Sequence, residues 1–461
     1  MKIILFPIES IARELDYKLM LASMYSSKEN MIFIGQHDYI YEMSKFITKG
    51  MYLGKNLFSV REDGTWQNRH STLRNKGFSI LHLDEEGAVY WGDENTWRRR
   101  LNKRMDVGKI RFDDYICTWG GFQKRHYECV TAANTDNIIN TGHPRFDMLH
   151  NKKYAELYSE EVDEIKSKYG DYVLIPTAFA WFNNPQGYKD SFSKRWNFSY
   201  DGSLEAYKEQ IENWSYSGKI FCEYINMALS LSVKFPNINF IIRPHPAEDS
   251  TPYICAFRKI INIHIEKDGN IAPWLLSCKV LIHDGCTTAI EGFFAGKKVI
   301  NFQLENNRAH QMFLPSVVSD QKTSIDSVIR SIEKVFINEN VDKIVINDRA
   351  KSLLQNFSIN NNSFLNIINV MDIASKSIDY SVINNFSFTF FKVRFQIFLL
   401  LKRIIRPLFK EKYRQYKVYK SIFPGFDKKN IKAKVEKINK ITENGADFNF
   451  INENLILITK K

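Results

Sequence analysis

Two segments in the second half of the chain carry residue types that can bind a phosphate. In the first, IIRPHPAED, an apolar run ends at Arg243 and continues with His245 and Pro246. A guanidinium and an imidazole at the end of a buried strand can hold an anion at the rim of a parallel sheet. A histidine in a rigid proline turn is the structural alternative. We favour binding because of the segment that follows.

The second segment, KVLIHDGCTTAIEGFFAGKKVINF, predicts a strand, a small polar turn, a helix and another strand. Exposed amides at a helix start attract anions, since the helix carries about half a positive charge there. Glu291 can accept hydrogen bonds from a ribose, or it can be the capping-box partner of a threonine N-cap. The predicted nucleotide contacts of this segment are Asp284, Gly285, Cys286, Thr287, Thr288 and Glu291.

Three acids in the first half of the chain, Asp84, Glu85 and Glu86, follow a short apolar run in LHLDEEGAVYW. The end of a strand in a doubly wound domain faces the ligand cleft, so these acids are candidates for catalysis. One carboxylate of such a group can act as a nucleophile and a second carboxyl group can transfer a proton. An acidic loop on a solvated face is the alternative.

Further candidates for substrate contacts lie at other predicted strand exits, which face the cleft in doubly wound folds. They are Glu9 and Arg13 after the first strand, and His143 and Arg145 in TGHPRFDML after the fifth. The spacing of Glu14 and Lys18 also suits a surface ion pair, which contributes little stability. The segment TGHPRFDML can line the cleft or merely shape the exit turn.

Short apolar runs alternate with longer mixed stretches in two series, which begin near residues 3 and 172. Short continuous runs suit buried parallel strands, and the stretches between them suit crossover helices. The pattern predicts an α/β protein with two doubly wound, Rossmann-like domains facing a cleft. The expected units are an acceptor and catalytic domain over 1–165, a nucleotide-sugar domain over 166–375 and a basic, amphipathic helical extension over 376–461.

Composition and charge narrow the class of protein. With 461 residues, 44% of them hydrophobic and 25% charged, the chain can bury two sizeable cores. The six cysteines form no CxxC pair, and the start lacks the pattern of a signal peptide, so we expect a reduced, cytoplasmic protein. The sequence shows no Asp-x-Asp and no metal-ligand spacing, which predicts chemistry without a metal or another cofactor.

The net charge of +12 is concentrated near the end of the chain, between Phe386 and Lys420. Phenylalanines interleaved with these cations predict an amphipathic anchor for an anionic membrane surface, over Lys392–Lys420. The apolar run over 395–401 is far shorter than the roughly 20 residues that cross a bilayer. Nucleic acid is the rival partner of such a segment, but no nucleic-acid motif accompanies it. A crossing helix with a merely solvated basic face is the third possibility.

Several segments together resemble the bacterial surface carbohydrate biosynthesis proteins, a group with the GT-B glycosyltransferase fold. They are PIESIARELDYKLMLA, LHLDEEG, ICTWGGFQK, TGHPRFDML, RPHP, HDGCTTAIEGFFAGK and IFPGF. Their order and spacing cover most of the chain. The resemblance implies a GT-B enzyme that uses a nucleotide-sugar donor. Together with the basic segment, it predicts a cytoplasmic protein that associates peripherally with the inner membrane.

The LHLDEEG segment is also similar to the Glu-Asp-Gly element of the retaining Kdo transferases of capsule and lipopolysaccharide synthesis. Aligned on the glycine, the resemblance places the family's nucleophilic acid at Glu86 and its neighbour at Glu85. It implies a CMP-linked ulosonic acid, such as Kdo or a nonulosonic acid, as the donor and retained configuration in the product. The acceptor is then a surface polysaccharide or a lipid-linked glycan.

Other functions remain open on the same fold. A UDP-sugar or CDP-polyol transferase fits the same nucleotide site. A sugar-nucleotide 2-epimerase shares the two-domain plan but does not need a basic anchoring tail. A non-catalytic subunit that binds glycan or membrane is disfavoured by the RPHP segment and the acidic strand end.

Overall fold

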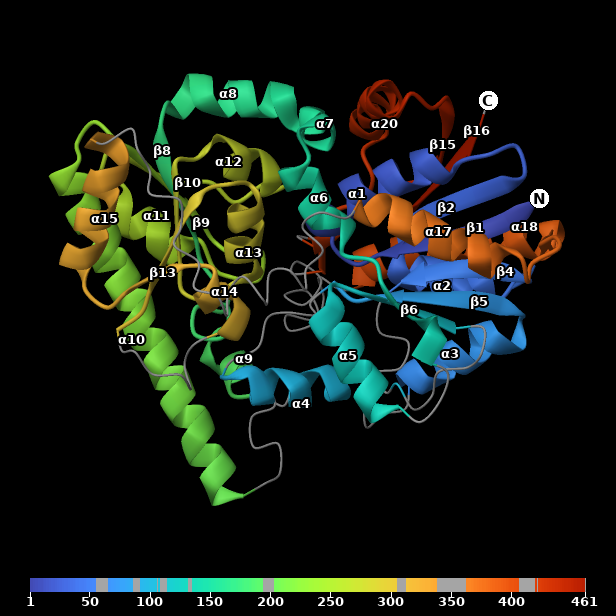
Figure 1. The fold of residues 1–461 in the computed structure, drawn as a ribbon, viewed down its shortest axis with the longest axis horizontal. Helices are drawn as coiled ribbons and strands as arrows, with labels where there is room; N and C mark the ends of the chain where they lie inside the picture. Colours follow the sequence, from blue (N-terminus) through green and yellow to red (C-terminus); the bar gives the residue numbers. More distant parts are fainter. Residues whose placement is uncertain are drawn as a thin grey trace.

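The computed structural model describes residues 1–54, 65–85, 92–105, 107, 114–131, 135–193, 203–304, 312–337, 362–405, 419–420 and 422–460. Within these residues the chain forms two large sheets, each covered by helices on both faces (Figure 1). Figure 1 also shows the two units side by side, with α8 (Ser159–Tyr169) passing from one to the other. This confirms the predicted α/β class with two Rossmann-like domains.

The first sheet has the strand order β15-β16-β2-β1-β4-β5-β6-β7. The strands from β2 to β7 in this order run parallel, and their burial is nearly continuous because helices cover both faces. The bounds are β1 (Lys2–Ile8), β2 (Asn30–Gln36), β4 (Gly50–Gly54), β5 (Phe78–Leu83), β6 (Asp114–Thr118), β7 (Ile138–Asn140), β15 (Ala446–Asn452) and β16 (Leu455–Lys460).

The helices of this half follow the strands as crossover connections. They are α1 (Ile11–Tyr25), α2 (His37–Ser44), α3 (Thr65–Asn75), α4 (Glu94–Arg104), α5 (Gly121–Val130), α6 (Pro144–His150) and α7 (Lys152–Ala155). A small antiparallel pair joins β3 (Ile47–Thr48) to β14 (Val382–Ile383).

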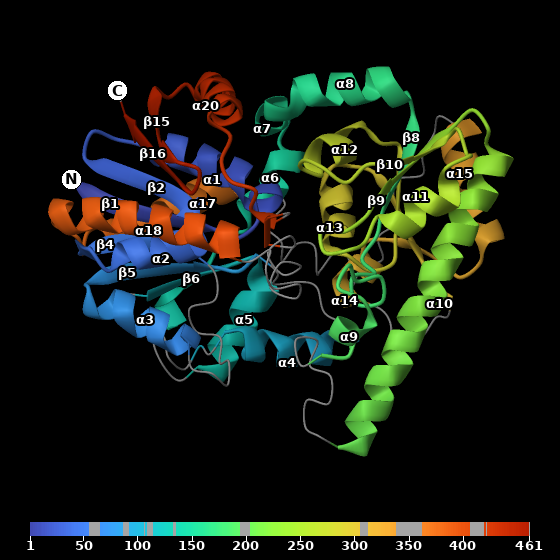
Figure 2. The ribbon, with the colours of Figure 1, turned by 180° about the vertical axis from the view of Figure 1, so that it is seen from behind.

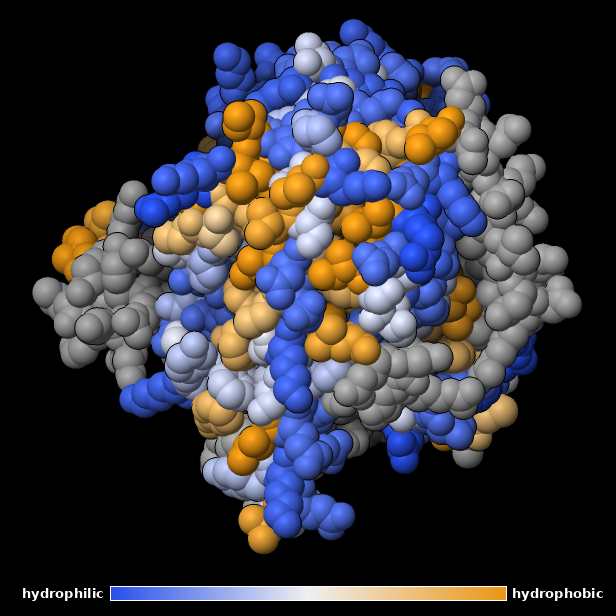
Figure 3. Space-filling model, turned by 90° about the vertical axis from the view of Figure 1, so that its left-hand side faces the viewer, coloured by the Kyte–Doolittle hydropathy of each residue, from blue (hydrophilic) through white to orange (hydrophobic). Residues whose placement is uncertain are grey.

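The second sheet is entirely parallel, with the order β10-β9-β8-β11-β12-β13. Its strands are β8 (Tyr172–Pro176), β9 (Asn239–Arg243), β10 (Ile263–Ile265), β11 (Val280–His283), β12 (Lys298–Phe302) and β13 (Asp320–Lys322). Its helices are α9 (Tyr188–Ser191), α10 (Leu204–Lys234), α11 (Thr251–Phe257), α12 (Ala272–Ser277), α13 (Thr287–Phe294), α14 (Phe313–Val317) and α15 (Ile325–Ile337). The outer face of this half mixes hydrophobic and hydrophilic side chains (Figure 3).

The end of the chain returns to the first sheet, which differs from the expected helical extension. Helices α17 (Ser363–Ser375), α18 (Asn385–Ile405) and α20 (Lys428–Thr442) are present, but β15 and β16 form a hairpin that pairs with β2. Helix α17 lies within the expected second domain yet contacts β5, β6 and α6 of the first sheet. The hairpin adds strands to the sheet because its alternating apolar residues cover the exposed edge of β2.

Helix α18 is held to the first sheet by one face only. Phe388, Phe391 and Phe395 pack into the cluster that includes Phe33 and Tyr39. Figure 2 shows the helix lying along this side of the first sheet, beside α2. In the described part of the chain, no helix has the length and hydropathy of a membrane span.

Candidate active site between the two sheets

Glu85 is the centre of a buried polar cluster at the end of β5. Its side chain is 2% exposed. The Tyr17 hydroxyl donates a hydrogen bond to its carboxylate, and Lys18 Nζ lies 3.7 Å from it. His143 Nε2 lies 3.3 Å and Arg145 Nη1 3.9 Å from Glu85 Oε2. Burial would raise the pKa of Glu85, but His143, Lys18 and Arg145 hold it well below its usual range.

Helix α1 supplies two further members of this cluster, Glu14 and Lys18. Lys18 Nζ donates to the Pro7 carbonyl at 2.6 Å and to Glu14 Oε2 at 2.7 Å. Glu14 Oε1 accepts the backbone amides of Glu9 and Ser10, at the start of the helix. The interpretation of Glu14 and Lys18 as a surface ion pair is therefore wrong: both are buried, since this face of α1 points toward the ends of the strands.

His143 and Arg145 reach Glu85 from the start of α6. His143 is the N-cap of this helix, and its Nδ1 accepts the Arg145 amide at 3.2 Å. In the neutral ring the proton is therefore on Nε2, which faces Glu85. Burial lowers the pKa of His143 although the Glu85 carboxylate raises it. The imidazole is oriented by a backbone amide, and its Nε2 faces the Glu85 carboxylate.

Arg145 also links the two halves of the molecule. Its Nε lies 3.1 Å from Glu291 Oε1 on α13, and both side chains are buried. Beside this pair, Phe146 and Phe294 stack with their ring centroids 4.8 Å apart. Helix α6, which follows β7 of the first half, therefore packs against α13 of the second half. Burial raises the pKa of Glu291, opposed by the charges of Arg145 and Arg13.

Arg243 and His245 occupy the end of β9, as predicted, but their side chains differ in role. Arg243 Nη2 donates to the carbonyls of Asp268 at 2.8 Å and Gly269 at 3.1 Å, and its guanidinium lies over the Trp274 ring. Its other terminal nitrogen, Nη1, is buried and has no hydrogen-bond partner among the described residues. Burial lowers the pKa of Arg243 to about 10. Arg243 thus holds the loop over residues 268–269 through its Nη2 group.

Glu248 organises the turn after β9 and was not singled out in the sequence. Its buried carboxylate accepts hydrogen bonds from Thr177 Oγ1 and the Phe179 amide, both at 2.9 Å. It also accepts from the Tyr253 hydroxyl at 2.7 Å and the His245 amide at 3.2 Å. Burial raises its pKa, and these donors oppose the rise. The hydrogen bonds of Glu248 therefore hold the turn on its buried side, while His245 and Pro246 are exposed.

The turn after β11 is rigid and leaves the start of α13 without a side-chain cap. His283 Nδ1 accepts the Gly285 amide at 2.9 Å, and Gly285 has a φ of 119°. The N-cap is Cys286, which makes no capping hydrogen bond, so the capping-box interpretation of Thr287 or Thr288 is wrong. The Ala289 amide donates to the Cys286 carbonyl at 3.1 Å, and the lack of a side-chain cap suits an anion site at this helix start.

Asp284 stands between this turn and Glu248. It is buried, and its Oδ1 has no hydrogen-bond partner among the described residues. Burial raises the pKa of Asp284 to about 7, and the charge of Glu248 adds to the rise. Near neutral pH this carboxyl group can therefore be protonated and donate a hydrogen bond, or be ionised and accept one.

The remaining predicted site residues differ in how deeply they are buried. Asp84 is buried and its carbonyl accepts the Trp119 indole hydrogen, whereas Glu9 is exposed and Arg13 half-buried. Glu86, the expected nucleophile, lies outside the described residues. Tyr17, Glu14, Lys18 and Glu248 were missed as site residues because their polar roles appear only once the strand ends are assembled.

One group of side chains could hold a metal ion, although the sequence shows no metal-ligand spacing. His70, His82 and Asp114 present possible ligand atoms that all lie within 4.8 Å of one another. The three come from α3, β5 and β6, so no local spacing in the sequence reveals them. Among the described residues, this is the one group of three such side chains.

Comparison with known proteins gives matches among solved structures alone. No family model and no curated protein matches the chain. The UDP-GlcNAc 2-epimerase of Neisseria meningitidis, bound to UDP-GlcNAc, is 12% identical with a TM-score of 0.45, over 81% of this chain and 100% of that one. The epimerase of Methanocaldococcus jannaschii is 11% identical with a TM-score of 0.47, over 81% and 99%. The wall teichoic acid polymerase TagF is 9% identical with a TM-score of 0.45, over 81% and 88%.

Proposed function

We propose that this protein is an enzyme that binds a nucleotide-activated sugar between its two halves and transfers the sugar to a glycan. The observation that carries the proposal is the placement of Glu85. It is a buried, ionised carboxylate at the end of β5, and Arg145 connects it to Glu291 on α13. A carboxylate thus stands opposite an uncapped helix start in the other half of the molecule.

This arrangement suits a donor that spans the two halves. The phosphate would lie at the start of α13, with Arg243 Nη1 as a further donor, and the sugar would extend toward Glu85. Amides at a helix start stabilise the negative charge that develops on a departing phosphate. Asp284 and Glu291 are the carboxyl groups within reach of a ribose. Glu9, Arg13 and His143 would contact the sugar or the acceptor.

A CMP-linked ulosonic acid is our preferred donor. Among the residues that the structure describes, Glu85 is our proposed catalytic carboxylate. A carboxylate can capture or stabilise an oxocarbenium-like transition state. Two such displacements retain the configuration, and Glu86 would then be the second carboxyl group. A UDP-sugar or a CDP-polyol fits the same phosphate site, because the contacts described above concern the phosphate and the ribose and not the base.

A sugar-nucleotide 2-epimerase is the second candidate. Its support is the buried pair of Glu85 and His143, since epimerisation needs a proton to be removed and returned. Transfer at a membrane is favoured by α18, which presents Phe390, Ile397 and Ile404 outward beside basic residues. We therefore propose a peripheral association with the anionic inner face of the cell membrane.

Ligand binding and product analysis together separate these possibilities. CMP-, UDP-, GDP- and CDP-linked ligands are first compared by the thermal shift that each produces, because a ligand that binds the folded state raises its stability. The donor that binds is then incubated in D2O with and without a lipid-linked glycan. Transfer predicts release of nucleotide that depends on the acceptor. Epimerisation predicts deuterium in the sugar without an acceptor, and no shift with any nucleotide would contradict both.

A further inference from the structure

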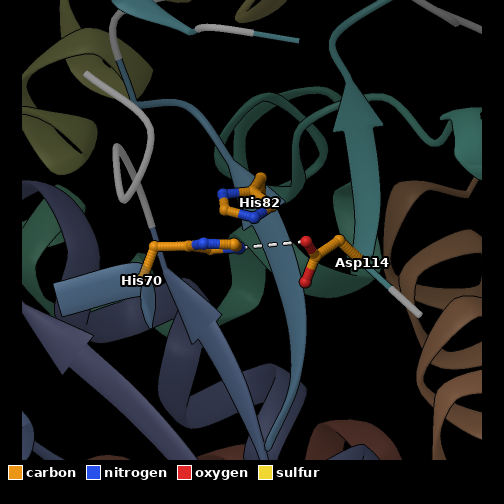
Figure 4. A group of neighbouring side chains, drawn as sticks. All are labelled: His70, His82 and Asp114. Carbon is orange, nitrogen blue, oxygen red and sulfur yellow. Dashed lines mark hydrogen bonds and ion pairs between the residues drawn. The ribbon is translucent and has the colours of Figure 1, made fainter. Parts of the chain in front are cut away.

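Three buried side chains converge between α3 and the first sheet (Figure 4). His70 Nε2 lies 3.0 Å from Asp114 Oδ2. His82 lies beside this pair, on the strand next to that of Asp114. The possible ligand atoms of all three are within 4.8 Å of one another. Two imidazoles and one carboxylate thus share a small volume inside the protein.

Two imidazoles and a carboxylate are ligands that zinc and related divalent transition metals accept. Bonds of about 2.0–2.2 Å to such a metal place neighbouring ligand atoms roughly 3.3 Å apart in a tetrahedron. One separation is 3.0 Å and the others do not exceed 4.8 Å, so side-chain adjustments would bring three ligands onto one ion. A fourth position would be left for water.

Metal binding requires neutral imidazoles and an ionised carboxylate. Burial lowers the pKa of His82 to about 3, so its ring is neutral. Burial would raise the pKa of Asp114, but the hydrogen bond from His70 and the charge of Arg74 oppose the rise, and the pKa lies below its ordinary value. The ligand set would carry a single negative charge toward a divalent ion.

Arg74 holds the carboxylate of Asp114 from the other side. Its Nη1 lies 3.6 Å from Asp114 Oδ1 and donates to the Phe78 carbonyl at 2.7 Å. Partners of this kind orient metal-binding carboxylates. Arg74, Asp114 and His70 by themselves would pin α3 to the sheet through hydrogen bonds. That hydrogen-bond network does not require His82, whose imidazole would supply the third metal ligand.

We propose that His70, His82 and Asp114 form a binding site for a divalent transition metal of the zinc type. The ion would tie α3 to β5 and β6. Since Glu85 follows His82 by three positions in the sequence, the ion would also stiffen the strand end that presents the catalytic carboxylate. The site is independent of the nucleotide-sugar site, and its test does not require activity.

The experiment compares the full-length protein with two variants after removal of metal by a chelator. Wild type, His82→Asn and His37→Asn are each titrated with Zn2+, and bound zinc is measured by elemental analysis. His37 is a matched control, because its Nε2 lies 3.1 Å from Asp38 beside Arg69 but it has no second histidine described nearby. We expect one tightly bound zinc in wild type and His37→Asn. Affinity should fall by at least about 100-fold in His82→Asn, the upper end of what loss of a supporting partner costs.

Equal zinc affinity in wild type and a folded His82→Asn variant would overturn the proposal, as would wild type that binds no zinc. If His82→Asn does not fold, X-ray absorption on the wild-type protein still tests the proposal. X-ray absorption of the zinc-loaded protein must show two imidazoles and at least one oxygen at the metal. A spectrum with fewer than two imidazoles would also overturn the assignment.

Discussion

At the scale of single residues, Glu85 is the centre of the buried polar cluster and the carboxylate that we propose for catalysis. Its carboxylate is surrounded by the hydroxyl of Tyr17, the ammonium of Lys18 and the imidazole of His143. The two cations near Glu85 each have a second carboxylate partner, because Lys18 is also paired with Glu14 and Arg145 with Glu291. Removal of the Glu85 charge therefore leaves each neighbouring cation with a partner. A neutral substitution can be tested without an unpaired buried charge.

Glu85→Gln should lower kcat by about 10²–10⁴-fold, the usual contribution of a positioned carboxyl group to catalysis. The measurement is steady-state turnover with the donor identified by thermal shift, and circular dichroism checks the fold. Glu94→Gln is the control, since Glu94 is an acid that pairs with Arg98 on α4. Full activity of a folded Glu85→Gln protein would remove Glu85 from the mechanism.

Asp284 predicts a pH dependence of stability. Its pKa is about 7 in the folded protein, against about 3.9 in an unfolded chain. Between these values the folded state keeps a proton that the unfolded state has lost, so this group's contribution to stability falls as pH rises. Asp284→Asn cannot ionise. The free energy of unfolding of the Asp284→Asn protein, relative to that of wild type, should rise by about 2–3 kcal/mol between pH 5 and pH 8, at roughly 1.4 kcal/mol per pKa unit.

Urea unfolding at several pH values measures this difference. Asp320→Asn is the control in the same half of the molecule. Burial would raise the pKa of Asp320, but Lys322 and Lys298 lower it, so the group is ionised throughout this range in both states. Its substitution should shift stability without a trend in pH. A trend for Asp320→Asn that equals the trend for Asp284→Asn would refute a specific role for the Asp284 carboxyl.

At the scale of elements, α18 has two apolar faces of different kinds. The inner face, with Phe391 and Phe395, packs on the first sheet. The outer face carries Phe390, Ile397 and Ile404, which are 64%, 52% and 60% exposed. Truncation before this helix would also remove α20 and the β15–β16 hairpin from the core. Substitution on the outer face is therefore the cleaner test of membrane binding.

The combined change of Phe390, Ile397 and Ile404 to Ser should abolish binding to vesicles that contain phosphatidylserine. Binding by wild type should itself weaken as salt rises, because basic residues contribute to it. Flotation or co-sedimentation measures the bound fraction. Val233→Ser on α10 is the control, an equally exposed apolar residue in the other half. Vesicle binding that the triple substitution leaves unchanged would exclude α18 as the anchor.

At the scale of the whole molecule, a few polar contacts join the two sheets with their helices. Arg145 pairs with Glu291, and Asn270 Nδ2 donates to Asp16 Oδ2 at 2.6 Å. Asp16 also pairs with Lys434 on α20, at 2.7 Å. The closed arrangement therefore depends on contacts from α1, α6, α13 and the returning end of the chain.

Combining Glu291→Gln with Asn270→Ala should loosen this arrangement while each half keeps its fold. We expect a larger radius of gyration in small-angle scattering, since two of the cross-domain contacts are lost. Glu333→Gln, which breaks a pair with Lys234 inside the second half, is the control and should leave the radius unchanged. Identical scattering curves for wild type and the double variant would show that other contacts set the domain arrangement.

The sequence by itself determined the two series of parallel strands and the segments at their ends. Continuous apolar runs identify strands that are covered on both faces, as in β1 and β11. The hairpin β15–β16 also has a local signal, the alternating residues of ADFNFIN before LILITK, although it was predicted as part of a helical extension. These features are readable because they depend on periodicity within one segment.

Only the tertiary structure decided which polar residues meet. The spacing of Glu14 and Lys18 is the same on an exposed helix and a buried one, so it could not reveal their place beside Glu85. Arg145 and Glu291, like His82 and Asp114, come from elements that are separate in sequence. Their proximity depends on strand order and domain packing, because a side chain's partners are set by the elements that fold against it.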